Sequence, residues 1–490
     1  MGASLTYLSR PVTTREIESF EFPGKARGAA GGIQGWRRGM EDAHCIFRDQ
    51  TGKSDSPKKI SVSPKSGSSP SKGKIPRDLA VFGVFDGHGG PAVANWVAGR
   101  IPSLLPTLTS YESGEYGKSL HDLFMALDDE MVSSQEALDA IKELGKKKQE
   151  HENDKMILDL PTLLAFCGAE DETPNLWLKP NINPELNLAD VKSLSELFDG
   201  PLLDEFAEIP RTGREPRRFA ISSKRVFEVL DSEQTPFGQG CTAVVCLIDF
   251  LNAKIYCANS GDSRAVLSRG GAAAALSVDH KPSQALERRR VLNAGGSIEG
   301  KGEYARVEGD LNLSRALGDH RYKLNKTLPA ELQIISARPD IRERSLCKYD
   351  EVLVMACDGI WETWTNQAAI DYVRGCLSDS EDLLKQLATS NDIEQTIDES
   401  FDQCIQKDLQ RDSPYADFTG CDNMTLLIVQ LDPEWLKNLP ESVDESLGAS
   451  FPPITFGAPV PAKTKKSRKE PKPKKQRPEH QTSSETENSA

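Results

Sequence analysis

Five aspartates in this sequence stand where apolar stretches begin or end: Asp42, Asp86, Asp262, Asp358 and Asp422. Asp86 and Asp358 each end an apolar run directly before a glycine, and Asp422 comes just before another such run. Hard divalent cations bind several carboxylate oxygens, and acids at the ends of different strands can meet at one rim of a sheet structure. Each aspartate alone could simply close a turn. Their shared position favours a magnesium-type metal site.

The most informative of these stretches is VFGVFDGHGG, from Val81 to Gly90. An apolar run typical of a buried strand ends in an acid, a histidine and glycines. An Asp-Gly turn would explain part of the pattern. A strand that holds a carboxylate rigidly, followed by glycines that allow a ligand to approach the backbone, explains all of it. The stretch therefore predicts a metal or phosphate site that includes Asp86 and His88.

The elements that must position these residues can be predicted from apolar patterning. Strand patterns cover residues 31–47, 78–86, 241–250, 253–269, 351–357 and 424–431. Helical spacing covers residues 90–105, 120–148 and 283–294, the last with a glycine stop. Strands therefore supply most of the ends that carry the acids, and helices connect them.

Three segments are expected to lie outside this core. Residues 51–76 are rich in Ser, Pro, Lys and Gly and predict a flexible insertion in a hairpin connection. Residues from about 133 to 235 are acidic and punctuated by proline, which predicts a large, partly helical insertion, either an interaction surface or merely a solvated one. Residues 433–490 form a Pro- and Lys-rich tail that cannot bury a core and is expected to be disordered.

Composition excludes several classes of protein. The net charge of −14 argues against a general nucleic-acid binder and predicts no DNA-specific recognition. Ten cysteines are scattered without a CxxC pair, which indicates buried, reduced thiols rather than disulfides or zinc. The sequence has no stretch of 18 apolar residues and no signal-peptide pattern, so we expect a soluble cytoplasmic or nuclear protein.

Both ends of the chain carry candidate targeting signals. MGASLT fits the N-myristoylation pattern at Gly2, which would give reversible membrane association, and an unmodified N-terminus is the alternative. Nine Lys/Arg residues lie between Lys463 and Arg477. This basic run is typical of a nuclear-localisation signal or an anionic-lipid contact, and a solvated extension is the alternative.

The chemistry-bearing segments occur in an order that resembles the metal-dependent protein phosphatases of type 2C. The matching segments are GWRRGMEDAH, VFDGHGG, NSGDSRAVL, DHKP, NAGG, LSRALGD, ACDGIW and DNMT, from Gly35 to Thr425. The resemblance implies an α+β fold over about residues 21–432, preceded by a short N-terminal segment, 1–20. In this fold a sandwich of two antiparallel β-sheets is flanked by α-helices. It also implies two Mg²⁺ or Mn²⁺ ions, with phosphoserine and phosphothreonine proteins as substrates of a monomeric enzyme.

The resemblance also assigns roles residue by residue. The implied direct metal ligands are Asp42, Asp86, Asp358, Asp422 and the backbone carbonyl of Gly87, while Glu41 acts through water and Asp262 serves a weaker third ion. Arg37 is implied to clamp the substrate phosphate, which suits its planar fork of donors. His88 is implied to protonate the leaving group, a task for which imidazole titrates in the right range.

This sequence departs from the family pattern at two places, since Glu362 replaces a commoner Asp and Cys421 precedes Asp422. Neither change removes an implied metal ligand. We therefore expect a protein serine/threonine phosphatase, in which a hydroxide bridging two metal ions attacks phosphorus in line. A phosphoprotein-binding regulator without activity and a hydrolase of small phosphomonoesters are the alternatives.

Overall fold

The computed structural model describes residues 7–51, 76–151, 235–377, 389–407 and 418–442. It also describes four two-residue strands, which pair as β6 (Ile157–Leu158) with β7 (Leu186–Asn187) and β8 (Glu208–Ile209) with β9 (Arg217–Arg218). Gly2, most of both predicted insertions and the basic tail lie outside the described residues.

One antiparallel sheet has six strands. Their order is β1 (Tyr7–Phe22), β2 (Ala26–Arg37), β20 (Met424–Leu431), β19 (Asp350–Ala356), β13 (Arg264–Arg269) and β14 (Ala272–Ala275). The two central strands, β20 and β19, are buried along their whole length, as expected for strands covered on both faces, and most of β2 is buried as well. The segments that carry the first and the last of the quoted motifs thus meet in one sheet, because β2 pairs directly with β20.

The second antiparallel sheet has five strands in the order β18 (Asp340–Ser345), β12 (Lys254–Ser260), β11 (Ala243–Asp249), β4 (Arg77–Phe85) and β3 (Ala43–Thr51). Residues of β4 alternate between its two faces. Phe82 and Val84 pack toward the first sheet with Leu353 and Leu427, whereas Val81 packs on the opposite side. Both faces of β4 are therefore buried, which explains its continuous apolar sequence.

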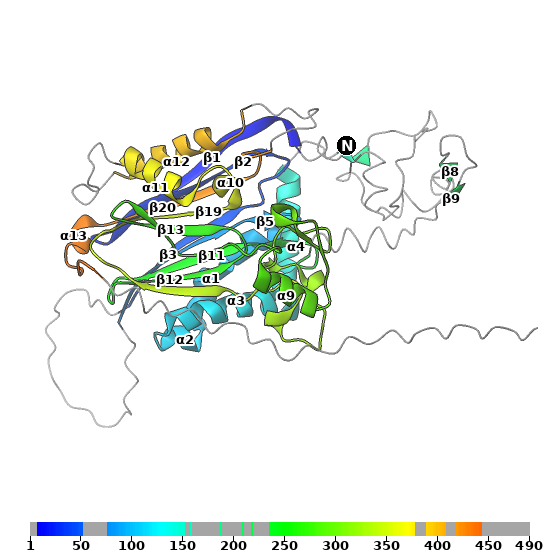
Figure 1. The fold of residues 1–490 in the computed structure, drawn as a ribbon, viewed down its shortest axis with the longest axis horizontal. Coiled ribbons are helices and arrows are strands. Elements are labelled where there is room, and N and C mark those ends of the chain that lie inside the picture. Colours follow the sequence, from blue (N-terminus) through cyan, green and yellow to red (C-terminus); the bar gives the residue numbers. More distant parts are fainter. Residues whose placement is uncertain are drawn as a thin grey trace, which may run out of the picture. The chain divides into compact units, whose positions relative to one another are not determined.

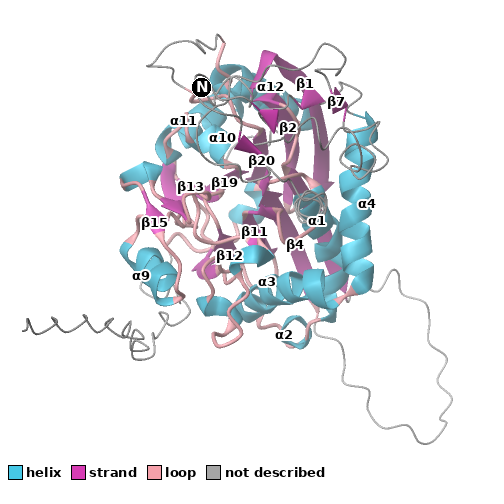
Figure 2. Cartoon of the chain, turned by 90° about the vertical axis from the view of Figure 1, so that its right-hand side faces the viewer, coloured by secondary structure: helices cyan, strands magenta, loops and turns pink. Residues whose placement is uncertain are grey.

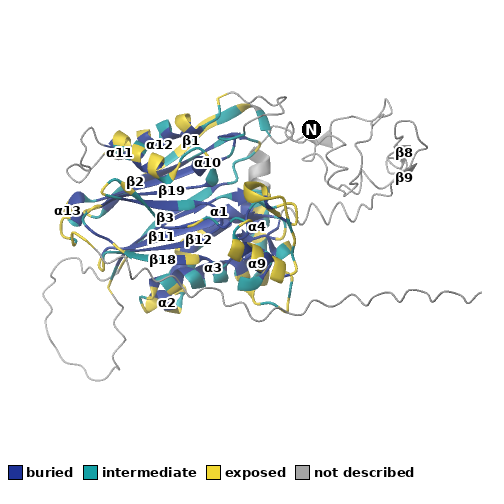
Figure 3. Ribbon diagram, in the orientation of Figure 1, coloured by how far each residue is buried: buried dark blue, intermediate teal, exposed yellow. Residues whose placement is uncertain are grey.

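Helices cover the outer face of each sheet (Figures 1 and 2). On the five-stranded sheet lie α1 (Ala92–Leu104), α3 (Tyr116–Ser133) and α4 (Gln135–His151), with the short α2 (Thr109–Glu112) beside them. On the six-stranded sheet lie α11 (Asn366–Leu377) and α12 (Ser390–Cys404). Figure 3 shows the buried residues along the strands and the exposed ones on the outer sides of these helices. This layering confirms the predicted sandwich flanked by helices.

Smaller elements complete the described fold. A three-stranded sheet joins β17 (Leu317–Gly318), β10 (Gly240–Cys241) and β5 (Gly87–His88). The segment between β14 and β18 contains α9 (Ala285–Asn293) and the hairpin β15 (Ile298–Glu299) with β16 (Arg306–Val307). It also has 3-10 turns at Gly302–Tyr304, His320–Tyr322 and Ala330–Leu332. Another 3-10 turn, Leu105–Thr107, follows α1, and the short α10 (Asp358–Trp361) follows β19.

The folded core extends beyond the predicted limits at both ends. Strand β1 begins at Tyr7, inside the segment 1–20 that was expected to precede the domain, and lies at the edge of the six-stranded sheet. After residue 432, where we expected disorder, α13 (Pro433–Leu436) continues the fold. The Asp432 side chain accepts hydrogen bonds from the backbone of Glu434 and Trp435, and Leu436 is buried. A capped Asp-Pro helix start thus holds this apolar residue in the core.

The start of the predicted acidic insertion also belongs to the core. Helix α4 places Ala137 and Ile141 among the buried residues that pack against α1 and α3. Of the described helices, none combines the length and apolarity that a membrane crossing requires. Every described cysteine is free of disulfide bonds.

Candidate active site

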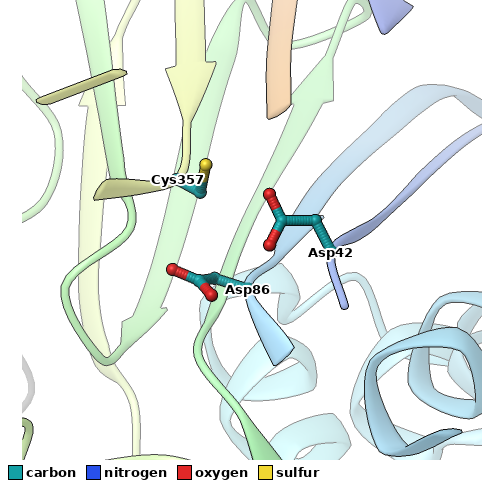
Figure 4. A group of neighbouring side chains, drawn as sticks. All are labelled: Asp42, Asp86 and Cys357. Carbon is teal, nitrogen blue, oxygen red and sulfur yellow. The ribbon is translucent and has the colours of Figure 1, made fainter. Parts of the chain in front are cut away.

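The predicted acids gather where strands of both sheets end. Asp42 precedes β3, Asp86 joins β4 to β5, and Asp262 lies between β12 and β13. Asp358 is the first residue of α10, directly after β19, and Asp422 precedes β20. The tightest group unites carboxylate oxygens of Asp42 and Asp86 with the Cys357 sulfur, all within 4.8 Å of one another (Figure 4). The other acids lie near enough for their charges to act on this group.

Burial and mutual repulsion both disfavour the charged forms of these acids. Shielding from water raises the pKa of Asp86 well above its usual range, and the negative charges of Asp358 and Asp42 raise it further. The pKa of Asp358 is raised in the same way, first by burial and then by Asp262 and Asp422. A site that holds several carboxylates together in this way suits a divalent cation, whose charge would offset their repulsion.

Asp42 is buried, at 5% exposure. Burial raises its pKa to about 6, although the Thr425 hydroxyl partly offsets the shift by donating a 2.8 Å hydrogen bond to Asp42 Oδ2. Thr425 lies on β20, so the six-stranded sheet orients an acid that precedes a strand of the other sheet. Asp42 therefore depends on both sheets for its position.

Glu41 and Gly87 are in close backbone contact beside Asp42. A β-carbon at Gly87 would lie 2.3 Å from the Glu41 carbonyl oxygen, so only glycine fits there. Burial raises the pKa of Glu41 to about 7. The Glu41 amide donates to Asn423 Oδ1 at 2.9 Å, and the Asn423 amide group donates to the carbonyls of Gln34 and Gly39. Asn423, which the sequence did not single out, thus fixes the loop that carries the first acids.

Arg37, the last residue of β2, forms an ion pair with Asp422 through Nη2. Burial acts to lower its pKa, but the charge of Asp422 outweighs this and the pKa is raised. Its side chain is 37% exposed, yet its Nε is buried and lacks a hydrogen-bond partner among the described residues. Arg37 is therefore partly exposed at the site, while its ion pair with Asp422 fixes one side of the guanidinium.

His88 is held by an acid that the sequence did not single out. Its Nε2 lies 2.6 Å from Oδ2 of Asp319, which is fully buried. Asp319 has left-handed backbone angles, φ 52° and ψ 35°, an uncommon conformation that is found preferentially at functional sites. Burial acts to lower the pKa of His88, but the Asp319 carboxylate raises it overall. The pair thus favours the protonated imidazole.

The loop that carries Asp319 is anchored by a second buried pair. Asp128 on α3 accepts hydrogen bonds from the Gly318 amide at 2.9 Å and from Lys323 Nζ at 2.7 Å. A β-carbon at Gly240 would lie 2.5 Å from Asp319 Oδ2 and 2.7 Å from His88 Nε2. The pairing of β17, β10 and β5 therefore places His88 and Asp319 side by side, with room only for a glycine at residue 240.

Asp262 already has a cationic partner, because Lys281 Nζ donates to its Oδ2. Burial acts to lower the pKa of Lys281, but Asp262 and then Asp358 raise it overall. Asp262 is only 1% exposed, so the ion pair is shielded from solvent on the side of the carboxylate. Lys281 lies in the DHKP motif, but only the three-dimensional structure shows that it pairs with Asp262.

Cys357 belongs to the tightest group but is poorly suited to bind a metal. Burial, followed by the charge of Asp42, raises the pKa of its thiol well above the usual range. Its sulfur accepts a hydrogen bond from the Thr425 amide at 3.1 Å and contacts the Asn423 carbonyl at 3.4 Å. Since the thiolate is the form that binds metals, a thiol kept neutral here acts as a packing and hydrogen-bonding group.

The segment between β14 and β18, which we call the flap, contains a network of buried charges around α9. Glu287 on α9 accepts from Nη2 of Arg290 and Nη2 of Arg315, each at 2.7 Å, and from the Ser314 hydroxyl at 2.8 Å. Neither arginine is more than 4% exposed. Arg315 also donates to Asp340 on β18 at 2.7 Å. We call this set Glu287, Arg290, Arg315 and Asp340 the flap base.

Comparisons with known proteins agree on one family. The sequence model described as Protein phosphatase 2C matches residues 26–147 and 216–408. The chain is 31% identical to Probable protein phosphatase 2C 21 of Arabidopsis thaliana, over 87% of this chain and 92% of that protein. It is 30% identical to Probable protein phosphatase 2C 11 of Oryza sativa subsp. japonica, over 90% and 94%. With Protein phosphatase 1G of Homo sapiens the identity is 26%, over 84% and 89%.

Proposed function

Because this chain belongs to the protein phosphatase 2C family, we propose that it is an active, metal-dependent enzyme that hydrolyses phosphoserine and phosphothreonine in proteins. The observation that carries the proposal is the strained set of carboxylates around Asp42 and Asp86 at the ends of the two sheets. A protein that only bound phosphoproteins would have no need to hold these acids together against their repulsion.

The residues present fit two Mg²⁺ or Mn²⁺ ions. We assign to them the side chains of Asp42, Asp86, Asp358 and Asp422 and the carbonyl of Gly87, with Glu41 acting through water. When bound, the ions would supply a water activated for in-line attack on phosphorus. A weaker third ion at Asp262 would have to displace Lys281 from that carboxylate.

Arg37 binds the phosphate of the substrate in this proposal. Asp422 takes one of its donors and orients the guanidinium, which leaves donors on the exposed part of the side chain for phosphate oxygens. Two parallel hydrogen bonds to a phosphate hold it more firmly than a single contact can. The positive charge also stabilises negative charge that develops on the equatorial oxygens during transfer.

His88 supplies a proton to the departing serine or threonine oxygen. Its Nε2 faces Asp319, so the proton that is free to move lies on Nδ1. The side chain is 24% exposed and can therefore meet a bound substrate. Asp319 favours the charged imidazole and fixes the ring, which keeps a proton available near neutral pH.

Phosphate release from a phosphothreonine peptide tests the proposal. We expect release with Mn²⁺, none with EDTA, and a loss of at least about a thousandfold in Asp86→Asn, because that change removes an assigned metal ligand. Asp249→Asn is the matched control, since Asp249 is a buried aspartate that caps a turn after β11, outside the site. Binding of the peptide without release would instead favour a phosphoprotein-binding regulator, whereas full activity in Asp86→Asn would contradict the assignment of Asp86 as a metal ligand.

Location and assembly remain proposals from the sequence. We propose a monomer in the cytoplasm or nucleus, with Gly2 as an acylation site and the run from Lys463 to Arg477 as a targeting signal. A fluorescent fusion lacking residues 461–478 and a Gly2→Ala variant test these signals separately. An unchanged distribution in both variants would remove the targeting roles.

A further inference from the structure

The N-terminal strand β1 reaches the active site at its first described residue. Tyr7 is paired with Arg37 across β1 and β2. The carbon at the centre of the Arg37 guanidinium lies 5.9 Å from the centre of the Tyr7 ring. This distance is within the range of a favourable cation–π contact. The arginine that we assign to phosphate binding therefore lies against an aromatic face.

Regular strand pairing would not bring Tyr7 to this position. Val12 pairs with Gly35, and a ladder continued without interruption from there would place Arg10 opposite Arg37. Two like charges directly opposite each other are destabilising. Instead the register shifts between Val12 and Tyr7, and the shift sets the tyrosine beside the arginine. Irregularities of this kind often redirect a side chain next to an active site.

A second ring supports Tyr7 from behind. Tyr7 and Phe418 are stacked, with their ring centres 5.4 Å apart and their planes 10° from parallel. Both rings pack against the buried Trp36 and Cys421. Cys421 directly precedes Asp422, the ion-pair partner of Arg37. The aromatic pair therefore joins the strand that carries Arg37 to the segment that carries its acid.

We propose that Tyr7 is a positioning residue for Arg37: its ring, supported by Phe418, holds the guanidinium in the orientation that binds the substrate phosphate. The inference rests on the proposed function of Arg37. It makes β1 part of the substrate site, although the strand lies at the edge of the sheet and precedes the region that the family model matches. The Arg37 side chain is 37% exposed, so the held guanidinium can meet a substrate phosphate.

The test measures binding of inorganic phosphate to the full-length, Mn²⁺-loaded protein by calorimetry, beside kcat and KM for a phosphothreonine peptide. We expect Tyr7→Leu to weaken phosphate binding and raise KM by about three- to tenfold, with kcat changed by less than about twofold. Tyr7→Phe keeps the ring and should retain wild-type affinity. In an Arg37→Ala background, Tyr7→Leu should have no further effect on binding.

Tyr349→Leu serves as the matched control. Tyr349 carries Lys348 over its ring at 5.0 Å, but it lies just before β19, whereas the site follows the other end of that strand. Thermal unfolding checks that each variant folds. If Tyr7→Leu fails to fold, Phe418→Leu removes the support from behind the ring, and we expect it to weaken phosphate binding by about two- to threefold.

The outcomes separate this inference from the proposed function. Unchanged phosphate affinity in Tyr7→Leu overturns the inference, and so does an equal loss in the Arg37→Ala background, because Tyr7 would then act elsewhere. If the wild-type protein binds phosphate but hydrolyses no phosphopeptide, the proposed function fails. The role of Tyr7 is still decided in that case by the phosphate affinities.

Discussion

Asp319→Asn is the change that most directly tests how this site handles the leaving group. Asparagine keeps the size of the side chain and tolerates the left-handed backbone of residue 319. The change removes only the negative charge that lies 2.6 Å from His88 Nε2. The second oxygen of Asp319 is buried and has no hydrogen-bond partner among the described residues. Removing the charge of Asp319 therefore affects mainly the hydrogen bond to His88.

The size of the effect follows from that single contact. A hydrogen bond to a charged group contributes about 1.5–3 kcal/mol. If Asp319 stabilises the imidazole in its proton-donating position, the loss lowers kcat by about ten- to a hundredfold, since about 1.4 kcal/mol corresponds to tenfold. The folded protein should survive, because the neutral amide can still hydrogen-bond to the ring.

Two substrates in parallel make the assay specific. A phosphothreonine peptide has a leaving group that needs a proton, whereas p-nitrophenyl phosphate releases an anion that is stable without one. We expect Asp319→Asn to lower kcat for the peptide by the full factor and kcat for p-nitrophenyl phosphate by less than about threefold. Asp310→Asn is the control, because Asp310 is an exposed acid that contacts Arg321 and Tyr322 instead of His88.

An equal loss with both substrates would refute this reasoning, because it would show that Asp319 affects the site as a whole rather than proton transfer. No loss with the peptide would refute it as well. A selective loss with the peptide, together with an unchanged KM, would assign Asp319 to the orientation of the general acid.

Three further predictions follow from other contacts. Gly87→Ala should destabilise the protein and impair metal binding, because its β-carbon would lie 2.3 Å from the Glu41 carbonyl oxygen. Gly99→Ala, in α1 with open space around it, should stabilise the protein by about 0.5–1 kcal/mol. Chemical denaturation measures the stability of both variants. Mn²⁺ affinity should fall as the pH drops through about 6, since protons then compete for Asp42. Titration calorimetry across this pH range measures the affinity, and a constant affinity would contradict the prediction. Glu287→Gln should lower the free energy of unfolding by about 3–5 kcal/mol at neutral pH. Burial alone would raise the pKa of Glu287, but its arginine partners lower it overall. The wild-type advantage in stability therefore exists above the unfolded pKa of about 4.5 and should shrink in denaturation curves at lower pH. An advantage that grew in acid would contradict the pairing.

The sequence allowed the layered fold and the meeting of the acids to be predicted because both depend on local signals. Strands such as β4 and β19 are continuous apolar runs, and each ends in an acid followed by glycine. The order of the motifs then supplied the family and hence the pairing of the strands. Only the resemblance, and no pattern of spacing, connected Arg37 and His88 with particular tasks.

Long-range contacts were the part that could not be predicted. Strand β1 has few apolar residues and contains a proline, as expected for an edge strand, and its shifted register depends on Arg37 in the partner strand. Asp319 lies in a quoted motif, but its backbone angles and its contact with His88 arise from strands distant in the sequence. The same holds for Lys281, whose neighbour in space, Asp262, determines its part in the site.

The flap base has a consequence for how enzymes of this kind can change their substrates. Glu287, Arg290 and Arg315 all lie between β14 and β18, so they hold this segment together internally, while Arg315 also ties it to Asp340 on β18 at 2.7 Å. The outer part, from β15 to β16, carries no comparable buried charges, and Tyr304 at its tip is 85% exposed. The flap base and the β15–β16 hairpin are thus under separate constraints. Mutations can remodel the wall that a phosphoprotein meets, while the groups that cleave the phosphate stay where they are.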